Sequence, residues 1–342
     1  MELWLAIPLL IVGFVCLVKG ADWFVDGAAG IAAKLHVPQL IIGLTIVSFG
    51  TSAPELATSI ISAFQGSADI AVGNVIGSNI TNILLILGVA SIICPLVVQK
   101  SARYFDFPVL LGSSVLLLFF GLNDNVIGTA EGWIMFAIAM IYTVFLIVYG
   151  FKQSQQETAT HGIDTSHTIV VLEKGDEEPK KGFAGWYESM KEHAWFLLVI
   201  TVVGLALIVV GALYGVIPAA TAIAEAFGVP EKIIGLTIVA VGTSLPELVT
   251  CVIAAKKGET DIAVGDIVGS NIFNILRTLG LSAAILPLAF ESSFLIDGLI
   301  ALGAAGLLAV FGYMKNHKVQ RWGGIIMLVG FVVYYVYLFA LA

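Results

Sequence analysis

The amino-acid sequence predicts an all-α polytopic membrane protein of about ten transmembrane helices, arranged as two inverted five-helix repeats. Hydrophobic residues make up 59% of the chain and charged residues only 12%, which is far outside the composition of soluble proteins. The chain also contains an internal duplication, because Val37–Leu96 aligns without a gap with Val229–Leu288. The shared positions include the polar motifs GTSxPE and GSNIxNIL, which a common apolar composition does not explain.

Hydrophobic runs long enough to cross about 30 Å of hydrocarbon recur along the chain. The predicted spans lie near residues 3–25, 39–64, 69–95, 104–121, 128–151, 194–218, 231–256, 261–287, 294–314 and 322–341. They divide the chain into a first repeat (1–151), a polar and charged segment (152–193) expected to be a flexible cytoplasmic loop, and a second repeat (194–342). Because each repeat has an odd number of spans, the second enters the membrane upside down relative to the first, as in many secondary transporters.

Basic residues predict the orientation in the membrane, because cytoplasmic loops carry an excess of Lys and Arg. If both termini are outside, Lys232 is the basic residue of the outer connections. The inner connections then hold Lys19, Lys34, Lys100, Arg103, Lys152, Lys174, Lys180, Lys181, Lys191, Lys256, Lys257, Lys315, Lys318 and Arg321. We therefore expect a multi-pass protein of the cell membrane with both termini outside and the central loop in the cytoplasm. The acidic net charge of −8 argues against a nucleic-acid partner.

One hydrophobic span in each repeat is interrupted by the same motif, GTSAPE at Gly50–Glu55 and GTSLPE at Gly242–Glu247. The proline of each motif has no amide hydrogen, so the carbonyl four residues earlier loses its helical partner. A carbonyl freed in this way within the membrane needs another partner, and a cation can satisfy it. Glu55 and Glu247 are costly within a bilayer, where ionisable residues are functional candidates by default. Paired interrupted spans predict a binding site near the midplane.

The next span in each repeat supplies neutral oxygen ligands. Ser78 and Asn82 are four residues apart, as are Ser270 and Asn274, so each pair shares a helix face. Small-xxx-small glycine pairs in the same spans allow close helix packing; they are Gly73 with Gly77 and Gly265 with Gly269. The result is an all-oxygen cage with two carboxylates, which suits Ca²⁺ better than Mg²⁺ or a transition metal. The two negative charges balance one Ca²⁺ or two monovalent cations.

The paired GTSxPE and GSNIxNIL motifs resemble the two α-repeats of the sodium/calcium exchanger family, in the calcium:cation antiporter superfamily. The resemblance covers both repeats and the ten-span layout, and the compact chain looks like a prokaryotic-type member. It implies that Ca²⁺ and Na⁺ bind alternately between the repeats as transported substrates. By motif position it implies that Glu55 and Glu247 are central Ca²⁺ carboxylates, that Thr51 and Thr243 offer carbonyls to the same ion, and that Na⁺ positions are lined by Ser52, Ser244, Ser78, Ser270, Asn82, Asn274 and the carbonyls of Ser48 and Ala240.

Two positions depart from the family pattern or from the first repeat. Family members often carry Asp where this chain has Asn274, so the stoichiometry and any involvement of K⁺ stay open. Arg277 replaces Leu85 of the first repeat. We expect it to form a structural pair with an acid; the alternatives are snorkelling toward the outer surface and a fixed cation near the site.

Two other pairs of polar residues are weaker candidates for a role at the ion site. Asp69 and Asp261 are expected to cap helix N-termini, with cation attraction at the mouth as the alternative. Asn74 of the first repeat is replaced by Asp266 in the second, and both are weaker candidates for lining an ion pathway.

Three classes of function follow from these residues. The first is a secondary-active antiporter that exchanges Na⁺ for Ca²⁺ by alternating access. A Ca²⁺/H⁺ antiporter is the second, since the two glutamates could carry protons, and a cation channel with a carboxylate filter is the third. An enzyme is not expected, because the chain has no HExxH motif and no GxSxG elbow. No cofactor is expected, the lipid bilayer is the surrounding partner, and a monomer is the expected assembly.

Overall fold

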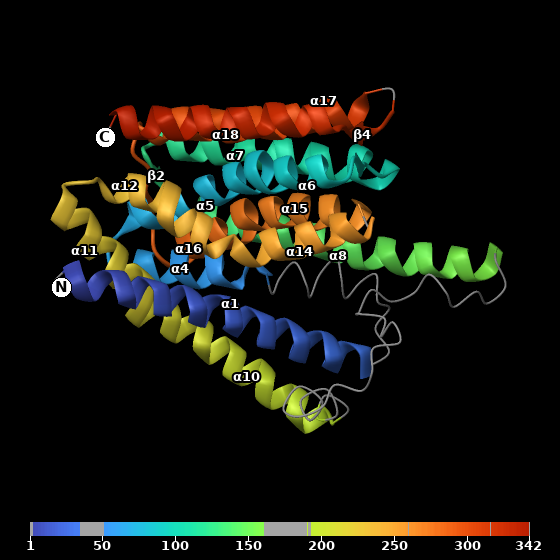
Figure 1. Ribbon diagram of the computed structural model, residues 1–342, viewed down its shortest axis with the longest axis horizontal. Coiled ribbons are helices and arrows are strands. Elements are labelled where there is room, and N and C mark those ends of the chain that lie inside the picture. Colours follow the sequence, from blue (N-terminus) through green and yellow to red (C-terminus); the bar gives the residue numbers. More distant parts are fainter. Residues whose placement is uncertain are drawn as a thin grey trace.

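The structure is a computed structural model that describes residues 3–34, 51–160, 190, 193–258, 260–314 and 316–341. Long helices lie side by side in a bundle (Figure 1). The first half contains α1 (Leu3–Lys34), α4 (Ala53–Phe64), α5 (Ala68–Ile80), the π-helical segment η2 (Thr81–Leu87), α6 (Gly88–Ile93), β1 (Leu96–Val97), η3 (Ala102–Asp106), α7 (Phe107–Asn123), β2 (Val126–Ile127) and α8 (Thr129–Thr160).

From the helix that contains the GTSxPE glutamate onward, the second half repeats most of this order. It contains α10 (Ala194–Val210), η5 (Gly211–Val216), α11 (Ile217–Phe227), α12 (Glu231–Ile234), η6 (Gly235–Val239), α13 (Ala240–Thr243), α14 (Leu245–Lys257), α15 (Thr260–Phe273), η7 (Asn274–Leu279), α16 (Gly280–Ile285), β3 (Leu288–Ala289), α17 (Phe294–Tyr313), β4 (Lys318–Val319) and α18 (Arg321–Leu341). The prediction of an all-α polytopic membrane protein is confirmed.

Seven helical segments among the described residues are long and apolar enough to cross a membrane. An eighth is formed if Glu231–Thr243 and Leu245–Lys256, which are bent by 46° relative to each other, count as one span. The predicted span 39–64 begins outside the described residues, and α4 forms its second part. The number ten therefore stays a prediction. Helix α8 continues to Thr160, beyond the predicted end of its span at residue 151.

The short strands display the inverted symmetry of the two halves. Strand β1 pairs antiparallel with β4 in the other half, and β2 pairs in the same way with β3. In the repeat alignment β1 corresponds to β3 and β2 to β4, yet the two sheets lie at opposite ends of the helix bundle (Figure 1). A rotation that exchanges the halves therefore also exchanges the ends. Both chain termini lie at the end that holds β2 and β3 (Figure 1).

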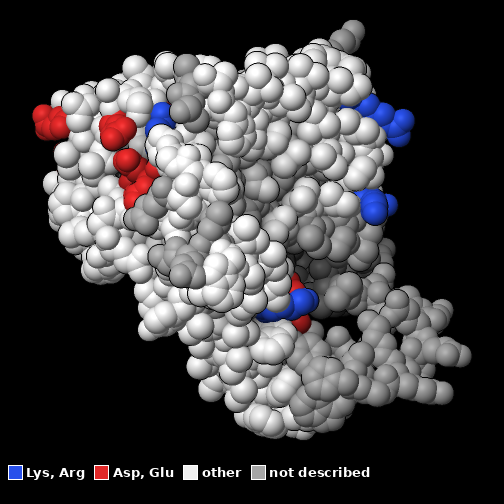
Figure 2. Space-filling view, turned by 60° about the vertical axis from the view of Figure 1, so that its left-hand side comes forward, with Lys and Arg blue, Asp and Glu red and all other residues white. Residues whose placement is uncertain are grey.

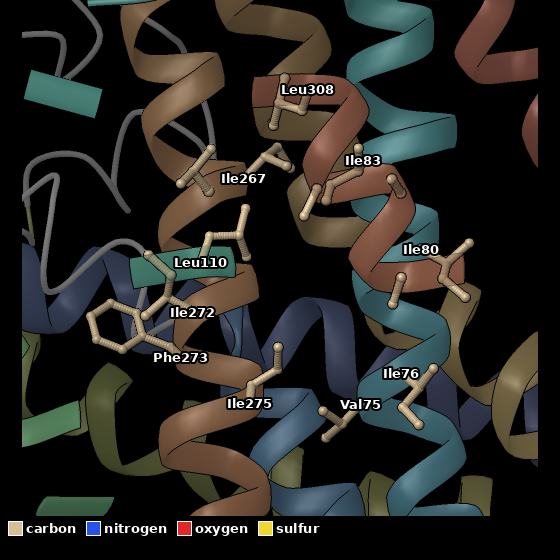
Figure 3. Packing of buried hydrophobic residues seen from close by; sticks show 14 of the residues in the cluster. Val75, Ile76, Ile80, Ile83, Leu110, Ile267, Ile272, Phe273, Ile275 and Leu308 are labelled. Carbon is tan, nitrogen blue, oxygen red and sulfur yellow. The ribbon is translucent and has the colours of Figure 1, made fainter. Parts of the chain in front are cut away.

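Helices α5 and α15 form the centre of the larger apolar cluster. Figure 3 shows their side chains gathered together with residues from neighbouring helices; the labelled ones are Val75, Ile76, Ile80, Ile83, Leu110, Ile267, Ile272, Phe273, Ile275 and Leu308. The predicted close approach at the glycine motif is confirmed for Gly77, where a Cβ would lie 2.6 Å from the carbonyl oxygen of Leu236. This contact brings α5 of the first half against η6 of the second.

Helices α1 and α10 form a separate pair along one side of the bundle, opposite α17 and α18 (Figure 1). Their contact is lined by glycines: a Cβ on Gly20 would lie 2.7 Å from the carbonyl oxygen of Gly204, and one on Gly204 would lie 2.6 Å from that of Gly20. A smaller apolar cluster joins α1 to η5 and α11. The molecule thus has a large body around α5 and α15, with the α1–α10 pair packed beside it.

Candidate ion-binding site

Both interrupted spans break at the same residue of the repeated motif. Ser52 has φ −85° and ψ 8°, and Ser244 has φ −82° and ψ 7°, so the backbone departs from α-helical geometry at the same position of both motifs. Each break is followed by a new helix, α4 or α14, whose first turn contains the motif's proline and glutamate. A proline is tolerated there because an amide in the first turn has no partner within the helix. The break lies two residues after Gly50, near which we expected the backbone to loosen.

The two motifs meet through a reciprocal pair of side-chain contacts. Ser52 Oγ donates a hydrogen bond to Glu247 Oε1 at 3.4 Å, and Ser244 Oγ donates one to Glu55 Oε1 at 3.2 Å. Each contact joins one half of the chain to the other, and all four residues are buried. The glutamates also lie in the first turns of α4 and α14, where the helix dipole favours negative charge. Two acids that are far apart in the sequence are therefore brought to a single buried centre.

A second reciprocal contact marks the axis between the repeats. Asn79 Nδ2 donates to the backbone oxygen of Asn271, and Asn271 Nδ2 donates to the backbone oxygen of Asn79, both at 3.2 Å. This pair joins α5 to α15 and was missed in the sequence, although both residues belong to the repeated GSN motif. Asn82 Nδ2 also donates to Asn271 Oδ1, at 2.9 Å.

Several of the predicted neutral ligands gather near the α5–α13 contact. Ser78 Oγ donates to the carbonyl oxygen of Ala240 at 3.3 Å and lies 3.4 Å from Thr243 Oγ1. Thr243 Oγ1 in turn donates to Asn74 Oδ1 at 3.0 Å. Asn74 also donates to Ser59 Oγ and to the backbone oxygen of Glu55. It is therefore part of the network, although the sequence placed it among the weaker candidates.

Several buried oxygen atoms at the predicted ligand positions have no hydrogen-bond partner within the part of the chain that the structure describes. They are Glu55 Oε2, Glu247 Oε2, Ser270 Oγ, Asn82 Oδ1 and Asn274 Oδ1. Leaving a buried polar group unsatisfied costs about 1–3 kcal/mol, and more for a charged group. A set of such oxygens around two carboxylates has the donor chemistry that Ca²⁺ or Na⁺ requires.

The remaining predicted ligands can be placed only in part. Thr51 is buried next to Ser52 at the start of the described segment. Ser48 lies outside the described residues. The assignment of individual residues to Ca²⁺ or Na⁺ stays a prediction. Among the residues that the structure describes, no three His, Cys, Asp or Glu side chains come close enough to hold a metal together. Hydroxyl, amide and carbonyl oxygens would therefore complete the coordination of a cation.

Two charged residues of the second repeat also lie within reach of the site. Arg277 is only 3% exposed, its guanidinium lies 5.4 Å from the ring centre of Phe273, and its charge acts on both Glu55 and Glu247. This burial contradicts snorkelling toward the outer surface. Asp266 is 6% exposed and its charge acts on Glu247. The sequence signal for both was the same: a charge where the first repeat has a neutral residue.

The predicted capping role of Asp69 is wrong. Ser67 occupies the N-cap position of α5 and Asp69 lies in the first turn, where its charge interacts with the helix dipole without a capping hydrogen bond. The side chain of Asp261, for which we predicted the same role, is outside the described part of the structure.

A helical membrane protein whose inverted repeats bring paired carboxylates to a buried centre has the architecture of a secondary transporter. The chain matches the sodium/calcium exchanger protein family over residues 5–148 and 196–340 and belongs to this family. It is 36% identical to the putative antiporter CaxA of Alkalimonas amylolytica, over 97% of this chain and 98% of that one. It is 35% identical to the sodium/calcium exchanger MaX1 of Methanosarcina acetivorans, over 97% of each chain. The sodium-calcium exchanger NCX_Mj, in a crystal soaked with Na⁺ and Sr²⁺, superposes with a TM-score of 0.64 at 29% identity, covering 97% of this chain and 98% of that one.

Proposed function

We propose that this protein is a secondary-active antiporter that exchanges Na⁺ for Ca²⁺ across the membrane by alternating access. The observation that carries the proposal is the buried centre at which Glu55 and Glu247 each accept a hydrogen bond from a serine of the opposite repeat. Each carboxylate keeps a second oxygen, Oε2, buried without a hydrogen-bond partner in the described part of the chain. These oxygens are the natural first ligands of a dehydrated cation.

The chemistry of the centre favours Ca²⁺ and Na⁺ over other cations. Ca²⁺ accepts six to eight oxygen ligands in irregular geometry, whereas Mg²⁺ demands a tight octahedron and keeps its waters. Transition metals prefer imidazole or thiolate ligands, whereas serine hydroxyls contact the two glutamate side chains and an asparagine amide contacts the backbone of Glu55. One Ca²⁺ or two Na⁺ neutralise the two carboxylates, so both ions can compete for the same oxygens. The names of the relatives, sodium/calcium exchanger and antiporter, support the same pair of substrates.

Inverted repeats provide a simple basis for alternating access, because each half can adopt the conformation of the other. The contacts across the site are single hydrogen bonds between the halves, which a rearrangement can break and remake. The α1–α10 pair has its own apolar cluster and also touches the site motif: a Cβ on Gly242 would lie 1.9 Å from the ring of Phe14. A shift of α1 would therefore change the packing at the first residue of the GTSLPE motif directly.

The distribution of surface charge supports an orientation with both termini outside. Figure 2 shows most of the visible Asp and Glu side chains gathered at one side of the view, with a basic side chain beside them, while Lys and Arg side chains lie at the other side and near the lower centre. Near the β2–β3 sheet, the charges of Glu231 and Glu291 act on Asp69, and Lys232 lies beside them. Near the β1–β4 sheet, Arg103 contacts His317 and Lys318 is exposed. Positive charge favours the cytoplasmic side, so the end with the termini would face outward.

Two alternatives remain in different classes of transport. A Ca²⁺/H⁺ antiporter would use the same carboxylates as proton carriers. A channel is disfavoured by the complete burial of both glutamates, because a selectivity filter has to be reached from both sides. We further propose that the functional unit is a monomer in the lipid bilayer and that it has no enzyme activity.

The proposal is tested in proteoliposomes loaded with Na⁺ and diluted into Na⁺-free buffer that contains ⁴⁵Ca²⁺. Uptake that requires the outward Na⁺ gradient supports Na⁺/Ca²⁺ exchange. Uptake that follows an imposed pH gradient with no Na⁺ present would instead support the Ca²⁺/H⁺ antiporter. Flux that does not saturate and ignores both gradients would support the channel. The matched control is the E55Q/E247Q variant, reconstituted at the same protein density, which should give no uptake under any gradient.

A further inference from the structure

The second repeat differs from the first in carrying two additional buried charges of opposite sign. Asp266 stands where the first repeat has Asn74, and Arg277 stands where it has Leu85. Asp266 is 6% exposed and Arg277 is 3% exposed, so neither charge is at the surface. A single buried charge is expensive in the membrane. The appearance of one acid and one base in the same helical path, from α15 into η7, indicates that they act together.

The position of Asp266 can be inferred from its repeat mate as well as from its own surroundings. Asn74 contacts Ser59, Thr243 and the backbone of Glu55, which places it directly behind the first glutamate. Asp266 occupies the corresponding place behind Glu247, on which its charge acts. No three acidic side chains are close enough to share a metal within the described segments. From this position the charge of Asp266 contributes to the electric field at Glu247.

Arg277 approaches the same centre from another direction. Its charge acts on both glutamates, and its guanidinium lies 5.4 Å from the ring centre of Phe273, which holds it on the helix. Eleven residues separate it from Asp266, or roughly 16 Å along a helix at 1.5 Å per residue. The added acid and the added base thus lie toward different ends of the site. Arg277 stays charged at any physiological pH.

We propose that Arg277 is a tethered cation that takes the electrostatic place of one transported monovalent ion, and that Asp266 is the acid that balances it. This inference rests on the proposed exchange function. Glu55, Glu247 and Asp266 carry three formal negative charges and Arg277 carries one positive charge, so the buried site has a net formal charge of −2. One Ca²⁺ or two Na⁺ then neutralise it equally well. The two loaded states carry the same charge, and the exchange is electroneutral.

The test uses wild-type protein and the variants R277M, R277K, D266N and D266N/R277M in proteoliposomes with the voltage clamped by K⁺ and valinomycin. The quantity measured is the final ⁴⁵Ca²⁺ accumulation ratio at a fixed Na⁺ gradient. For the wild type and R277K, a change of 100 mV should leave this ratio unchanged. R277M has a site charge of −3 that a third Na⁺ can fill, so its ratio should change by about 50-fold per 100 mV if one full charge moves.

The double variant D266N/R277M gives the second repeat the uncharged character of the first at both positions and restores the charge of −2. It should therefore regain a voltage-independent accumulation ratio. Voltage-dependent accumulation by the wild type would overturn the inference, and so would a double variant that behaves like R277M. If the wild type shows no Na⁺-driven uptake at all, the proposed function has failed, and the charge balance is then judged from binding alone.

Equilibrium binding of ⁴⁵Ca²⁺ to the purified protein in detergent provides that independent measurement. The charge balance predicts weaker binding by D266N, tighter binding by R277M, and binding by the double variant within about 3-fold of the wild type, since opposite charge changes near one site offset each other. It also predicts that the double variant unfolds at a higher temperature than either single variant. This comparison remains informative if a single variant folds poorly, and equal or lower stability of the double variant would contradict the proposal.

Discussion

The two repeats agree at the centre of the site and differ in its surroundings. In both, a serine at the helix break contacts the glutamate of the other half, and an asparagine of the GSN motif contacts its mate across the axis. Behind the glutamate, the first repeat has Asn74 bonded to a serine hydroxyl. The second repeat has Asp266, with the thiol of Cys251 buried nearby. Further along the same helices, Leu85 corresponds to Arg277.

This difference separates the residues that ion exchange requires from the residues that adjust its selectivity and voltage dependence. A carrier with inverted repeats opens to each side in turn, so the groups that hold the ion have to serve both conformations equally. In this protein, the groups that we propose hold the ion are the ones that obey the symmetry. The surrounding charged residues set the net charge of the site. That net charge is a sum over all of these residues, so it does not matter which half supplies each charge. The asymmetric residues are therefore expected to change selectivity and voltage dependence, and the symmetric ones to change transport itself.

The largest effect is expected for the symmetric glutamates. E55Q and E247Q should each reduce Na⁺-driven ⁴⁵Ca²⁺ uptake by at least about 100-fold, because a unit charge 4 Å from another is worth about 4 kcal/mol at an effective dielectric constant of 20. The controls are S52A and S244A, which remove one neutral donor from each carboxylate and should reduce uptake by no more than about 10-fold. Near-normal uptake by either glutamine variant would remove that glutamate from the site.

A smaller effect, on stability, is expected at Asn82 and Asn274, which occupy matching positions of the two repeats. Asn82 Nδ2 donates to Asn271 Oδ1 at 2.9 Å, whereas in the described part of the chain neither side-chain polar atom of Asn274 has a hydrogen-bond partner. N82D would place a carboxylate oxygen against an amide oxygen and should destabilise the protein by about 2–4 kcal/mol. N274D loses no such bond and should fold normally.

Thermal unfolding of both variants in detergent, with and without Ca²⁺, tests this difference. Ca²⁺ should raise the unfolding temperature of N274D more than that of the wild type, since the added carboxylate strengthens cation binding. If N82D proves as stable as N274D, the asymmetry of the asparagine cluster has no energetic consequence.

The sequence predicted the fold class and the meeting of the two glutamates because both leave periodic or repeated signals. Hydrophobic spans, an odd number of them in each half and a repeated GTSxPE motif were sufficient to predict that Glu55 and Glu247 meet, and the structure brings them together. The prolines correctly indicated interrupted helices at this motif. The position of the break, at Ser52 and Ser244, was not predicted, because it depends on where the new helix begins.

Other parts of the site depend on packing across the axis between the repeats, which one sequence does not contain. The Asn79–Asn271 pair required knowledge that α5 and α15 touch at that residue. For Asp69, the capping prediction failed because Ser67, two residues earlier, takes the N-cap position. Arg277 was read as a structural partner because its distance from the glutamates depends on the π-helical segment η7, which turns the residues after Asn274 relative to a regular helix.

A moderate and unequal effect is expected at the asparagine pair on the axis. N79A removes one donor, the bond from Asn79 Nδ2 to the backbone oxygen of Asn271. N271A removes its own donor and also Oδ1, which accepts from Asn82. At about 1 kcal/mol for each hydrogen bond, N271A should be roughly twice as destabilising as N79A. Thermal unfolding of the two variants measures the ratio, and equal losses would mean that the Asn82 bond contributes nothing.

The smallest effect on transport concerns two tyrosines that stabilise the body of the molecule away from the site. Tyr142 Oη donates to Asp106 Oδ1 at 2.8 Å, and at the matching position of the second repeat Tyr334 Oη donates to Asp297 Oδ1 at 3.2 Å. Asp297 also forms an ion pair with Lys232 at 2.6 Å, and no ion pair of Asp106 is found in the described residues. Y142F therefore leaves the partly buried Asp106 without its donor, while Y334F leaves the buried Asp297 with its lysine.

We accordingly expect Y142F to lower the free energy of unfolding by about 1–3 kcal/mol and Y334F by about 1 kcal/mol or less. Neither change should alter the dependence of ⁴⁵Ca²⁺ uptake on Na⁺ concentration, because neither residue reaches the glutamates. Unfolding temperatures in detergent and uptake curves in proteoliposomes provide the two measurements. The control is the variant K232M, which lacks the lysine. In that background, Y334F should lower the free energy of unfolding as much as Y142F does in the wild type. If it does not, the lysine is not the reason why the two halves respond differently.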